Sequence, residues 1–400
     1  MPGMRIETFR RLFEPTGQEA LRAAQSLEPR EDSFLAHYQQ LTRRYDPDLS
    51  RLALEVAILR GEAGVKFPFA DQLYLTRESL EQASGWEVST YRAGRFRPYG
   101  LLVDLGCSVG GDTLALAGVS PTVGIDLDPL RLAMARANLE ALGLGRGAAV
   151  LRADLRSPLP LPRQHPSLAL FFDPARRAGG KRLHSVRRYQ PPLEIVHSWA
   201  VYTSALGVKI SPGVHLGELY GYDAEVEFIS VNGELKEAML WFGPLKSAAR
   251  RATLLPGGHT LVASGDSRFE KKPISEPGAY IYEPDASVLR AGLVTEVGAL
   301  LEACQLDPDI AYLTGLKNVS TPFARLWPIE AWFPFNLKRL RAYLREHGVG
   351  RVIVKKRGSP LQPEQLVREL RLSGAAERTL FLTHLRGEPI VVVALSSEEG

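Results

Sequence analysis

The spacing of hydrophobic residues divides the chain into a helical part and two parts in which strands and helices alternate. Between positions 49 and 59, leucine, alanine and valine recur at spacings of three and four, which places them on one face of a helix. No run with the alternating pattern of a strand occurs before Gly100. We therefore expect residues 1–95 to form a helical domain.

From position 101 the pattern changes to short apolar runs that end in a polar residue, glycine or proline. The runs are LLVDLG, TVGIDLD, AVLRAD, ALFFDP and GVKISP. Such near-continuous apolar runs are typical of parallel strands buried on both faces. After the second run, Asp128 can cap a helix that Pro129 begins and Gly143 ends. The pattern predicts an α/β domain over residues 96–270.

Beyond Pro212 the strands become longer and alternate. AEVEFISV, Asn232-Gly233 and ELKEAMLWF predict an antiparallel hairpin with a type I′ turn. Lys, Pro, Ser and Gly then dominate a linker that ends at Gly278. Further on we expect one helix in SVLRAGLVTEVGALLEACQ and another in QPEQLVRELRLSG, with strands in RVIVKKR, ERTLFLTHL and PIVVVALS. These elements predict a separate α/β domain over residues 279–400.

Composition agrees with a chain of several domains and limits its chemistry. The chain has 400 residues, more than one hydrophobic core usually organises, with 45% apolar and 24% charged residues. The formal net charge of +4 is too small to indicate nucleic-acid binding by itself. Only two cysteines are present, Cys107 and Cys304, and the eight histidines are scattered, so we expect neither a disulfide framework nor a metal site.

The first residues, MPGMRIETFRRLF, carry charges where a secretory signal needs an apolar stretch. No stretch reaches the roughly 20 apolar residues that span a bilayer. We therefore expect a cytoplasmic protein with no membrane partner.

Three acids follow three successive predicted strands: Asp104, Asp126 and Asp154. The carboxyl ends of parallel strands meet at one sheet edge, where open α/β sheets bind ligands. Each acid alone can be a turn or capping residue, but the ordered set favours a ligand site. Asp126 is placed to bind a ribose, and Asp154 to accept a hydrogen bond from an adenine amino group. The spacing of Gly106 and Gly110 lacks the G-x-G-x-x-G pattern that holds a pyrophosphate.

The motifs DLGCSVGGD, GIDLD, RADL and FFDPAR resemble, in this order, those of class I S-adenosylmethionine-dependent methyltransferases. The resemblance implies a Rossmann-like sheet and S-adenosyl-L-methionine as cofactor, with Cys107 as a small loop residue. By the same resemblance, Asp104, Gly106, Cys107 and Gly110 surround the methionine part of the cofactor, Asp126 and Leu127 its ribose, and Asp154 and Leu155 its adenine.

The fourth run ends in Asp173-Pro174-Ala175-Arg176. Methyl transfer is a direct displacement, so the protein must align the acceptor and manage one proton. Asp173 and Pro174 resemble the acid and proline of amino-group methyltransferases, whereas Arg176 resembles the D-P-P-R form of RNA carbon-5 methyltransferases. The latter need a cysteine after the fifth strand, and GVKISPGVHLG contains none. We predict catalytic roles for Asp173, Pro174 and Arg176.

Two segments carry basic residues beside these motifs. RRAGGKRLHSVRR has no acid, and its Arg177, Lys181 and Arg182 are candidates for RNA phosphates, although a solvated loop is an equal alternative. In the other segment, YRAGRFRPYG, two interpretations remain open, contact with the cofactor or a base and packing on the sheet. The residues that could make such a contact are Tyr91, Arg92, Arg95 and Phe96.

Four outer segments resemble bacterial methyltransferases with a THUMP-like C-terminal domain: FADQLYLTRESLEQASGWEVSTYRAGRF, EPDASVLRAGLV, DIAYLTGLKNVSTPFARLW and VKKRGSPL. Because THUMP domains present RNA in related enzymes, the resemblance implies a methyltransferase acting on tRNA or rRNA. Lys355, Lys356 and Arg357 suit a phosphate of folded RNA, or serve only solubility. The alternatives are a methyltransferase acting on a protein or small molecule, and a non-catalytic cofactor-binding RNA module.

Overall fold

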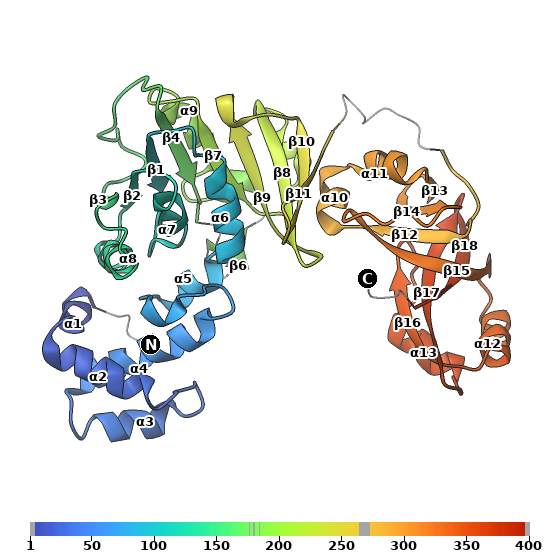
Figure 1. Ribbon diagram of the computed structural model, residues 1–400, viewed down its shortest axis with the longest axis horizontal. Coiled ribbons are helices and arrows are strands. Elements are labelled where there is room, and N and C mark those ends of the chain that lie inside the picture. Colours follow the sequence, from blue (N-terminus) through green and yellow to red (C-terminus); the bar gives the residue numbers. More distant parts are fainter. Residues whose placement is uncertain (1–4, 176, 179–180, 184, 264–272, 397–400) are drawn as a thin grey trace. The chain divides into compact units, whose positions relative to one another are not determined.

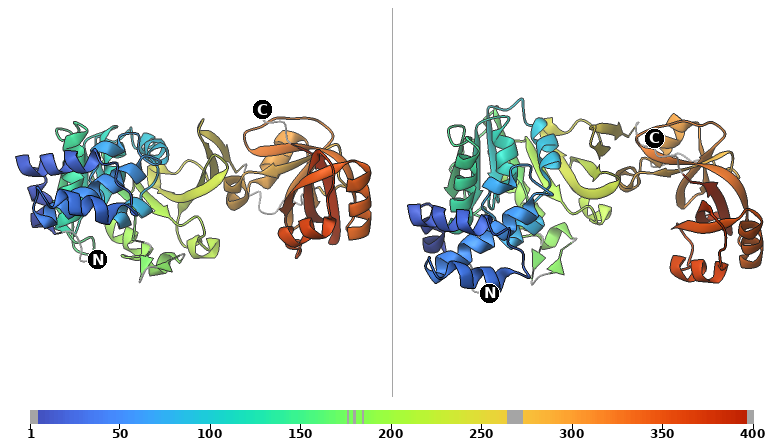
Figure 2. Two further views of the ribbon diagram at one scale, coloured as in Figure 1. Left: turned by 90° about the horizontal axis from the view of Figure 1, so that it is seen from below. Right: turned by 60° about the horizontal axis from the view of Figure 1, so that its bottom comes forward.

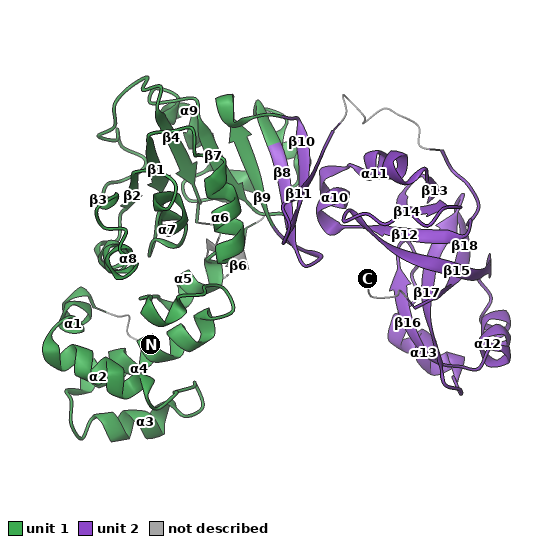
Figure 3. Cartoon of the chain, viewed as in Figure 1, with its two compact units in different colours: residues 1–225, 237–247 green, residues 226–236, 248–400 purple. Residues whose placement is uncertain are grey.

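The computed structural model describes residues 5–175, 177–178, 181–183, 185–263 and 273–396. The chain folds into two compact units (Figure 3). Unit 1 comprises residues 1–225 and 237–247, and unit 2 comprises residues 226–236 and 248–400. The division into three domains at 1–95, 96–270 and 279–400 stays a prediction.

Unit 1 begins with the helices that the spacing of apolar residues predicts. They are α1 (Ile6–Arg11), α2 (Pro15–Gln25), α3 (Phe34–Leu41), α4 (Pro47–Ala63), α5 (Arg77–Gln82) and α6 (Trp86–Gly94). Asp46 caps α4 because its carboxylate accepts hydrogen bonds from the backbone of Asp48 and Leu49. The predicted apolar face of α4 is buried.

This helical region does not enclose its core alone. Its buried residues pack in one cluster with Leu114 of α7 (Gly111–Ala117) and with Met134 and Leu139 of α8 (Pro129–Ala141). Figures 1 and 2 show the first helices beside α8, in agreement with the contacts between α1 and α8. The helical region is therefore held firmly against the helices that flank the sheet.

All five predicted apolar runs form strands: β1 (Leu101–Leu105), β2 (Thr122–Asp126), β3 (Ala148–Arg152), β4 (Leu168–Phe172) and β7 (Leu206–Ile210). They pair in parallel in the order β7-β4-β1-β2-β3, and β9 (Glu234–Phe242) runs antiparallel beside β7. Strands β4 and β7 are buried along their whole length. The prediction that every run is buried on both faces is wrong for β3, which lies at the sheet edge and is half-exposed.

The turns around α8 confirm the predicted capping. Asp128 accepts hydrogen bonds from the backbone of Leu130 and Arg131, Pro129 is the first helical residue, and Gly143 has a positive φ of 70° after the helix end. The remaining elements of unit 1 are short: η1 (Ala70–Gln72), β5 (Arg177–Ala178), β6 (Lys181–Arg182), η2 (Val186–Arg188), η3 (Leu193–Ile195), α9 (Val196–Trp199), η4 (Leu216–Leu219) and η5 (Gly243–Leu245).

The first segment of unit 2, residues 226–236, contains the predicted turn, in which Asn232 and Gly233 have φ values of 52° and 80°, as a type I′ turn requires. Strands β8 (Ala224–Val231), β10 (Arg250–Leu255) and β11 (His259–Val262) follow one another in the order β11-β10-β8. The predicted antiparallel hairpin thus has the expected turn, and β10 pairs in parallel with β8.

A second sheet of seven strands forms the rest of unit 2, in the order β13-β14-β12-β15-β18-β17-β16. Its strands are β12 (Tyr280–Pro284), β13 (Cys304–Asp307), β14 (Ile310–Gly315), β15 (Ala324–Pro334), β16 (Val349–Lys356), β17 (Ala376–Leu385) and β18 (Glu388–Leu395). Helices α12 (Leu337–Glu346) and α13 (Pro363–Leu370) pack on β16–β18 through buried leucines.

The prediction of one helix over SVLRAGLVTEVGALLEACQ is wrong. Gly292 adopts a left-handed conformation with φ 67° and ends α10 (Ala286–Ala291), after which α11 (Val294–Leu301) begins. Cys304 and Gln305 belong to β13 and pair with β14. The glycine, which can take positive φ without steric cost, separates two helices that the apolar pattern alone joins.

Within the described residues, no helix is both long and apolar enough to cross a membrane. The same residues contain no group of three or more histidines, cysteines or acids arranged to hold a metal ion. Cys107 and Cys304 are both free thiols.

Candidate functional site

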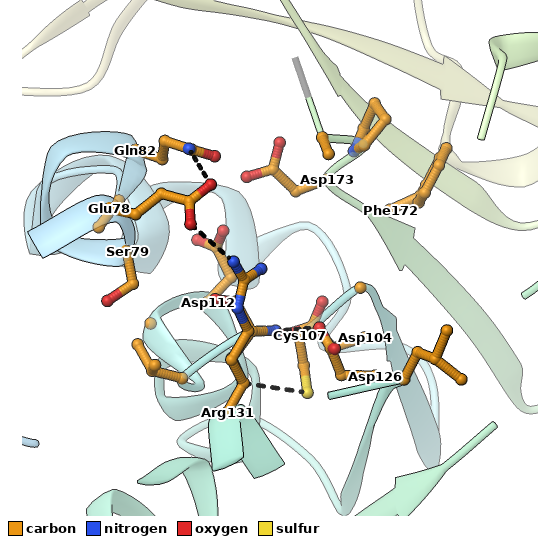
Figure 4. A pocket seen from close by; sticks show the side chains of 18 of the residues that line it. Glu78, Ser79, Gln82, Asp104, Cys107, Asp112, Asp126, Arg131, Phe172 and Asp173 are labelled. Carbon is orange, nitrogen blue, oxygen red and sulfur yellow. Dashed lines mark hydrogen bonds and ion pairs between the residues drawn. The ribbon is translucent and has the colours of Figure 1, made fainter. Parts of the chain in front are cut away.

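The ends of β1, β2, β3 and β4 open into one cavity of about 430 Å³ in unit 1 (Figure 4). Cavities that bind small molecules typically measure about 300–1,000 Å³. The predicted site residues that line it are Asp104, Gly106, Cys107, Asp126, Leu127, Asp154, Leu155, Asp173 and Pro174. Sequence positions almost 70 residues apart thus meet at one place.

Gly110 is the predicted cofactor residue that does not line the cavity. It has a φ of 90° and caps the start of α7. A Cβ atom at this position would lie 3.2 Å from the Cβ atom of Ala135 in α8. Glycine is therefore needed here for backbone conformation and for the close approach of two helices, while its neighbours Val109 and Gly111 line the cavity.

Asp104 is the most deeply buried carboxyl group of the cavity, with 1% of its surface exposed. The hydroxyl of Thr113 donates a hydrogen bond to its Oδ2 over 2.6 Å. Burial, reinforced by the negative charges of Asp112 and Asp173, raises the pKa of Asp104 to about 8. A cationic group bound beside this carboxyl would favour its ionised form.

Asp126 holds the glycine-rich loop against the end of β2. Its Oδ2 accepts a hydrogen bond from the backbone N–H of Ser108 over 2.9 Å, and its Oδ1 accepts one from Asp128 over 2.9 Å. Each carboxylate oxygen still has a further lone pair for a ligand. Asp154 is exposed, and its Oδ1 accepts a hydrogen bond from the backbone of Arg156 over 3.0 Å.

Cys107 lies in the same loop and is 5% exposed. Burial raises the pKa of its thiol well above the ordinary value, and Asp104 and Asp126 add to this shift. The thiol is therefore neutral at physiological pH. A neutral thiol is a poor nucleophile, which agrees with the expected part of Cys107 as a small loop residue.

At the end of β4, Asp173 is paired with a lysine that sequence reasoning missed. The Nζ atom of Lys209, on β7, lies 2.7 Å from Oδ2 of Asp173, and only 2% of the Lys209 side chain is exposed. A buried ammonium needs a carboxylate partner. The signal was present in GVKISP, where a lysine interrupts an otherwise apolar strand.

Helix α5 forms the wall of the cavity opposite the strand ends, where Figure 4 shows Glu78 and Gln82 on the side toward which Asp173 points. Glu78 pairs with Nη2 of Arg131 over 2.9 Å, and Nε2 of Gln82 donates to Glu78 over 3.2 Å. The sequence alone assigns no chemical role to the segment that contains α5. The structure places it at the cavity.

For YRAGRFRPYG the packing interpretation is confirmed for Arg92 and Phe96. Arg92 is 2% exposed and forms ion pairs with Asp112 and Glu237. The ring of Phe96 is fully buried against Phe171 and Trp241. Arg92 nevertheless acts on the site indirectly, because Asp112 lines the cavity.

The side chains of the predicted phosphate-binding residues near Pro174 lie outside the described part of the structure. Arg176 lies outside the described residues, and Arg177, Lys181 and Arg182 lie on the paired strands β5 and β6, of which only the backbone is described.

In unit 2, Lys355 and Arg357 both pair with Glu283, over 2.6 and 3.4 Å. Lys355 also stands over the ring of Trp327, and Arg357 over that of Tyr312. The exposed Lys356 donates to the backbone oxygen of Leu361. The single carboxylate of Glu283 therefore offsets one of the three positive charges of this triplet and holds Lys355 and Arg357 in place.

Comparison with known proteins identifies close relatives. The chain is 35% identical over 320 residues to a protein of Mycobacterium tuberculosis (strain CDC 1551 / Oshkosh) named as an uncharacterized S-adenosylmethionine-dependent methyltransferase. The match covers 78% of this chain and 85% of that protein. A protein of strain H37Rv, also named as an uncharacterized S-adenosylmethionine-dependent methyltransferase, matches with the same identity and the same coverage.

A crystal structure from Porphyromonas gingivalis W83, named as a candidate methyltransferase, shares the fold. It matches with a TM-score of 0.81 at 23% identity, covering 95% of this chain and 99% of that chain. A family model described as THUMP domain-like matches residues 324–395, and a model described as a domain of unknown function matches residues 5–63. The predicted fold class is confirmed.

Proposed function

The chain belongs to the S-adenosylmethionine-dependent methyltransferases, and from that premise we propose that its methyl acceptor is an RNA, either tRNA or rRNA, bound beside Asp173. The observation that carries the proposed site is the convergence of four strand-end carboxylates, 104, 126, 154 and 173, on one cavity that can hold the cofactor and the acceptor group together. S-adenosylmethionine supplies an electrophilic methyl group on a cationic sulfur. A cavity lined by acids suits such a cation.

The cofactor half of the cavity is defined here by Asp104, Asp126 and Asp154. Asp126 is proposed to bind the ribose hydroxyls, and Asp154, with the backbone of Leu155, the adenine. The loop from Gly106 to Val109, with Cys107, is proposed to surround the methionine part together with Asp104, while Gly110 holds this loop close to α8. The residues present fit this group, because Asp104, Asp126 and Asp154 line one cavity of about 430 Å³, a size typical of small-molecule sites. A cationic ligand beside Asp104 would also lower the raised pKa of this buried acid.

The acceptor half is defined here by Asp173, Pro174 and Lys209. The ammonium of Lys209 fixes one carboxylate oxygen of Asp173, so the carboxylate is held in one orientation toward the cavity. Asp173 and the carbonyl oxygen of Pro174 are proposed to accept hydrogen bonds from the acceptor group and so to align its lone pair. Arg176 is proposed to hold a phosphate or a base edge. The proton that the acceptor loses passes toward the Asp173 carboxylate and then to water.

The RNA part of the proposal is supported by the THUMP domain-like match over residues 324–395 and by the basic segment that follows Pro174. A target base inside a stem must leave its stack at a cost of a few kcal/mol. The pairing of Lys355 and Arg357 with Glu283, which makes these two cations less available to a phosphate, is the observation that favours the alternative, a protein or small-molecule acceptor.

A labelled-methyl transfer assay tests the proposal. The purified protein is incubated with labelled cofactor and with total RNA or total protein from a strain that lacks the enzyme. We expect label in the RNA fraction and none with the Asp173→Asn variant. Label in protein alone would contradict the RNA acceptor, and label in neither fraction, with the cofactor still bound, would indicate a non-catalytic module.

A further inference from the structure

Helix α12 in unit 2 has an unusual charge distribution. Its sequence, LKRLRAYLRE, contains the cations Lys338, Arg339, Arg341 and Arg345 against the single acid Glu346. Leu340 and Leu344 are fully buried against the sheet, so they fix which side of the helix faces inward. Lys338, Arg341 and Arg345 follow one another at spacings of three and four residues. They therefore form one stripe along the helix, which we call the α12 stripe.

No described residue forms an ion pair with the cations of α12. Arg341 donates a hydrogen bond to the backbone oxygen of Glu369, and Arg339 rests on the ring of Phe333 at 4.5 Å. The neighbouring acid Glu330 is already held at both oxygens by Arg378, over 2.8 and 2.9 Å. The charges of Lys338 and Arg345, which are exposed, thus remain available to an external anion, while Arg341 is half-buried between them.

Two other helices each pair an exposed or half-buried arginine with an acid on the same face. Arg51 pairs with Glu55 in α4, and Arg136 pairs with Glu140 in α8, each four residues further on. Such pairs stabilise helices. Within the described residues the α12 stripe forms no such pair, so its cations do not contribute to the helix through pairs of this kind.

The first turn of α12 strengthens this contrast. It contains no acid, while Lys338 and Arg339 are located there. The partial positive charge at a helix N-terminus favours acids and disfavours cations. This arrangement therefore costs helix stability, and an external anion would compensate for it.

We propose that the α12 stripe binds the phosphate backbone of the RNA substrate, an inference that rests on the function proposed above. Lys338 and Arg345 lie seven residues apart, about 10 Å along the helix axis, so the stripe can meet more than one phosphate of a strand. Phosphate contacts of this kind position an RNA without reading its sequence. The stripe also lies inside the THUMP domain-like match, at residues 324–395. On this proposal the α12 stripe, and not the triplet Lys355–Arg357, is the main phosphate contact of unit 2, because Lys355 and Arg357 are already paired with Glu283.

The test measures binding of the full chain to unfractionated tRNA and rRNA from a strain lacking the enzyme, over a series of salt concentrations. The variant Lys338→Gln with Arg345→Gln removes two exposed cations. The matched control, Arg136→Gln with Lys317→Gln, removes two exposed cations that are paired with Glu140 and Glu302. A third variant, Lys355→Gln with Arg357→Gln, tests the triplet.

We expect the α12 variant to lose RNA affinity by about 10-fold to 100-fold at 0.1 M salt, and the slope of log K against log salt to become shallower by about 1.4–1.8. Cofactor affinity and the turnover number at saturating RNA should not change. The control should bind RNA as the unmodified protein does.

Unchanged RNA binding in the α12 variant, an equal loss in the control, or a loss confined to the triplet variant would overturn the inference. So would failure of the unmodified protein to bind RNA at low salt. RNA that binds through the α12 stripe but accepts no label, while protein does, would instead overturn the proposed function alone.

Discussion

At the ends of β1 and β2, Asp104 and Asp126 accept hydrogen bonds from neutral donors, whereas at the end of β4 Asp173 is paired with a buried ammonium. Neutral donors orient a carboxylate without cancelling its charge. The ammonium of Lys209 orients Asp173 and cancels its charge at the same time. In the cofactor half Asp126 keeps its negative charge, and Asp104, which is protonated in the free protein at pH 7, becomes ionised when a cation binds beside it. The cofactor half therefore suits a cation, and the acceptor half suits a neutral group that donates a hydrogen bond.

The largest expected effect breaks the acceptor half alone. Asp173→Asn should lower methyl transfer by about 10²–10⁴-fold, because the acceptor group loses the carboxylate that accepts its hydrogen bond and its proton, while cofactor affinity changes little. Single-turnover transfer and calorimetric titration of the cofactor measure the two quantities. Asp173→Ala leaves a buried lysine unpaired, which costs about 3–5 kcal/mol, so the double variant with Lys209→Met is the matched control for folding. Retained turnover in Asp173→Asn would remove this residue from the acceptor site.

A smaller effect should follow from changing the partner and keeping the carboxylate. Lys209→Met should lower the turnover number on the order of 10-fold to 100-fold, because Asp173 is then no longer held in one orientation. Lys209→Arg, which keeps the charge, should recover part of the loss, and the Michaelis constant for the cofactor should stay the same. If both variants lose only melting temperature and turn over normally, Lys209 is a structural residue.

The cofactor half should respond in binding. Asp126→Ala removes a charged acceptor and should weaken cofactor affinity by about 10-fold to 100-fold, as charged hydrogen bonds contribute roughly 1.5–3 kcal/mol. Asp128→Ala is the matched control, because Asp128 caps α8 from the adjacent turn. It should cost about 1 kcal/mol of stability and leave affinity unchanged. Equal affinity in the Asp126 variant and the unmodified protein would place the ribose elsewhere.

The smallest expected effect is the release of less than one proton. With its pKa raised to about 8, Asp104 holds a proton at pH 7 in the free protein. A cationic group bound beside it favours the ionised form, so cofactor binding at pH 7 should release close to one proton. Calorimetry in buffers of different ionisation enthalpy measures this number, and Asp104→Asn should abolish it. Proton uptake, or no exchange, would contradict the assignment.

The same shift fixes the sign of the pH dependence of stability. The folded protein retains the Asp104 proton between the ordinary value of 3.8 and about 8, where the unfolded chain has lost it. The free energy of unfolding contributed by this group therefore falls as the pH rises through that window.

Local patterns in the sequence were enough to predict much of unit 1. Short apolar runs ending in acids identify buried parallel strands and their ligand edge, since both features belong to neighbouring residues. Asp128 and Pro129 likewise mark the start of α8 directly. The need for a glycine at position 110, in contrast, arises partly from the close approach of Ala135, which belongs to another helix.

Interactions between residues distant in sequence could not be predicted in this way. Lys209 meets Asp173 across 36 positions, and Lys355 meets Glu283 across 72. Helix α5 lines the cavity only because the helical region packs beside the strand ends, and local sequence patterns do not reveal that packing. In unit 2 the apolar pattern continued through Gly292, whose left-handed conformation is set by the fold around it.

A crystal structure with S-adenosylmethionine bound tests the central claim most directly, because that claim is a statement of geometry. We predict one cofactor molecule in the cavity, with its ribose hydroxyls at hydrogen-bonding distance from Asp126, its adenine at Asp154, and its methyl group directed toward Asp173. A cofactor bound outside this cavity, or one that leaves Asp126 and Asp154 without contact, would contradict the account.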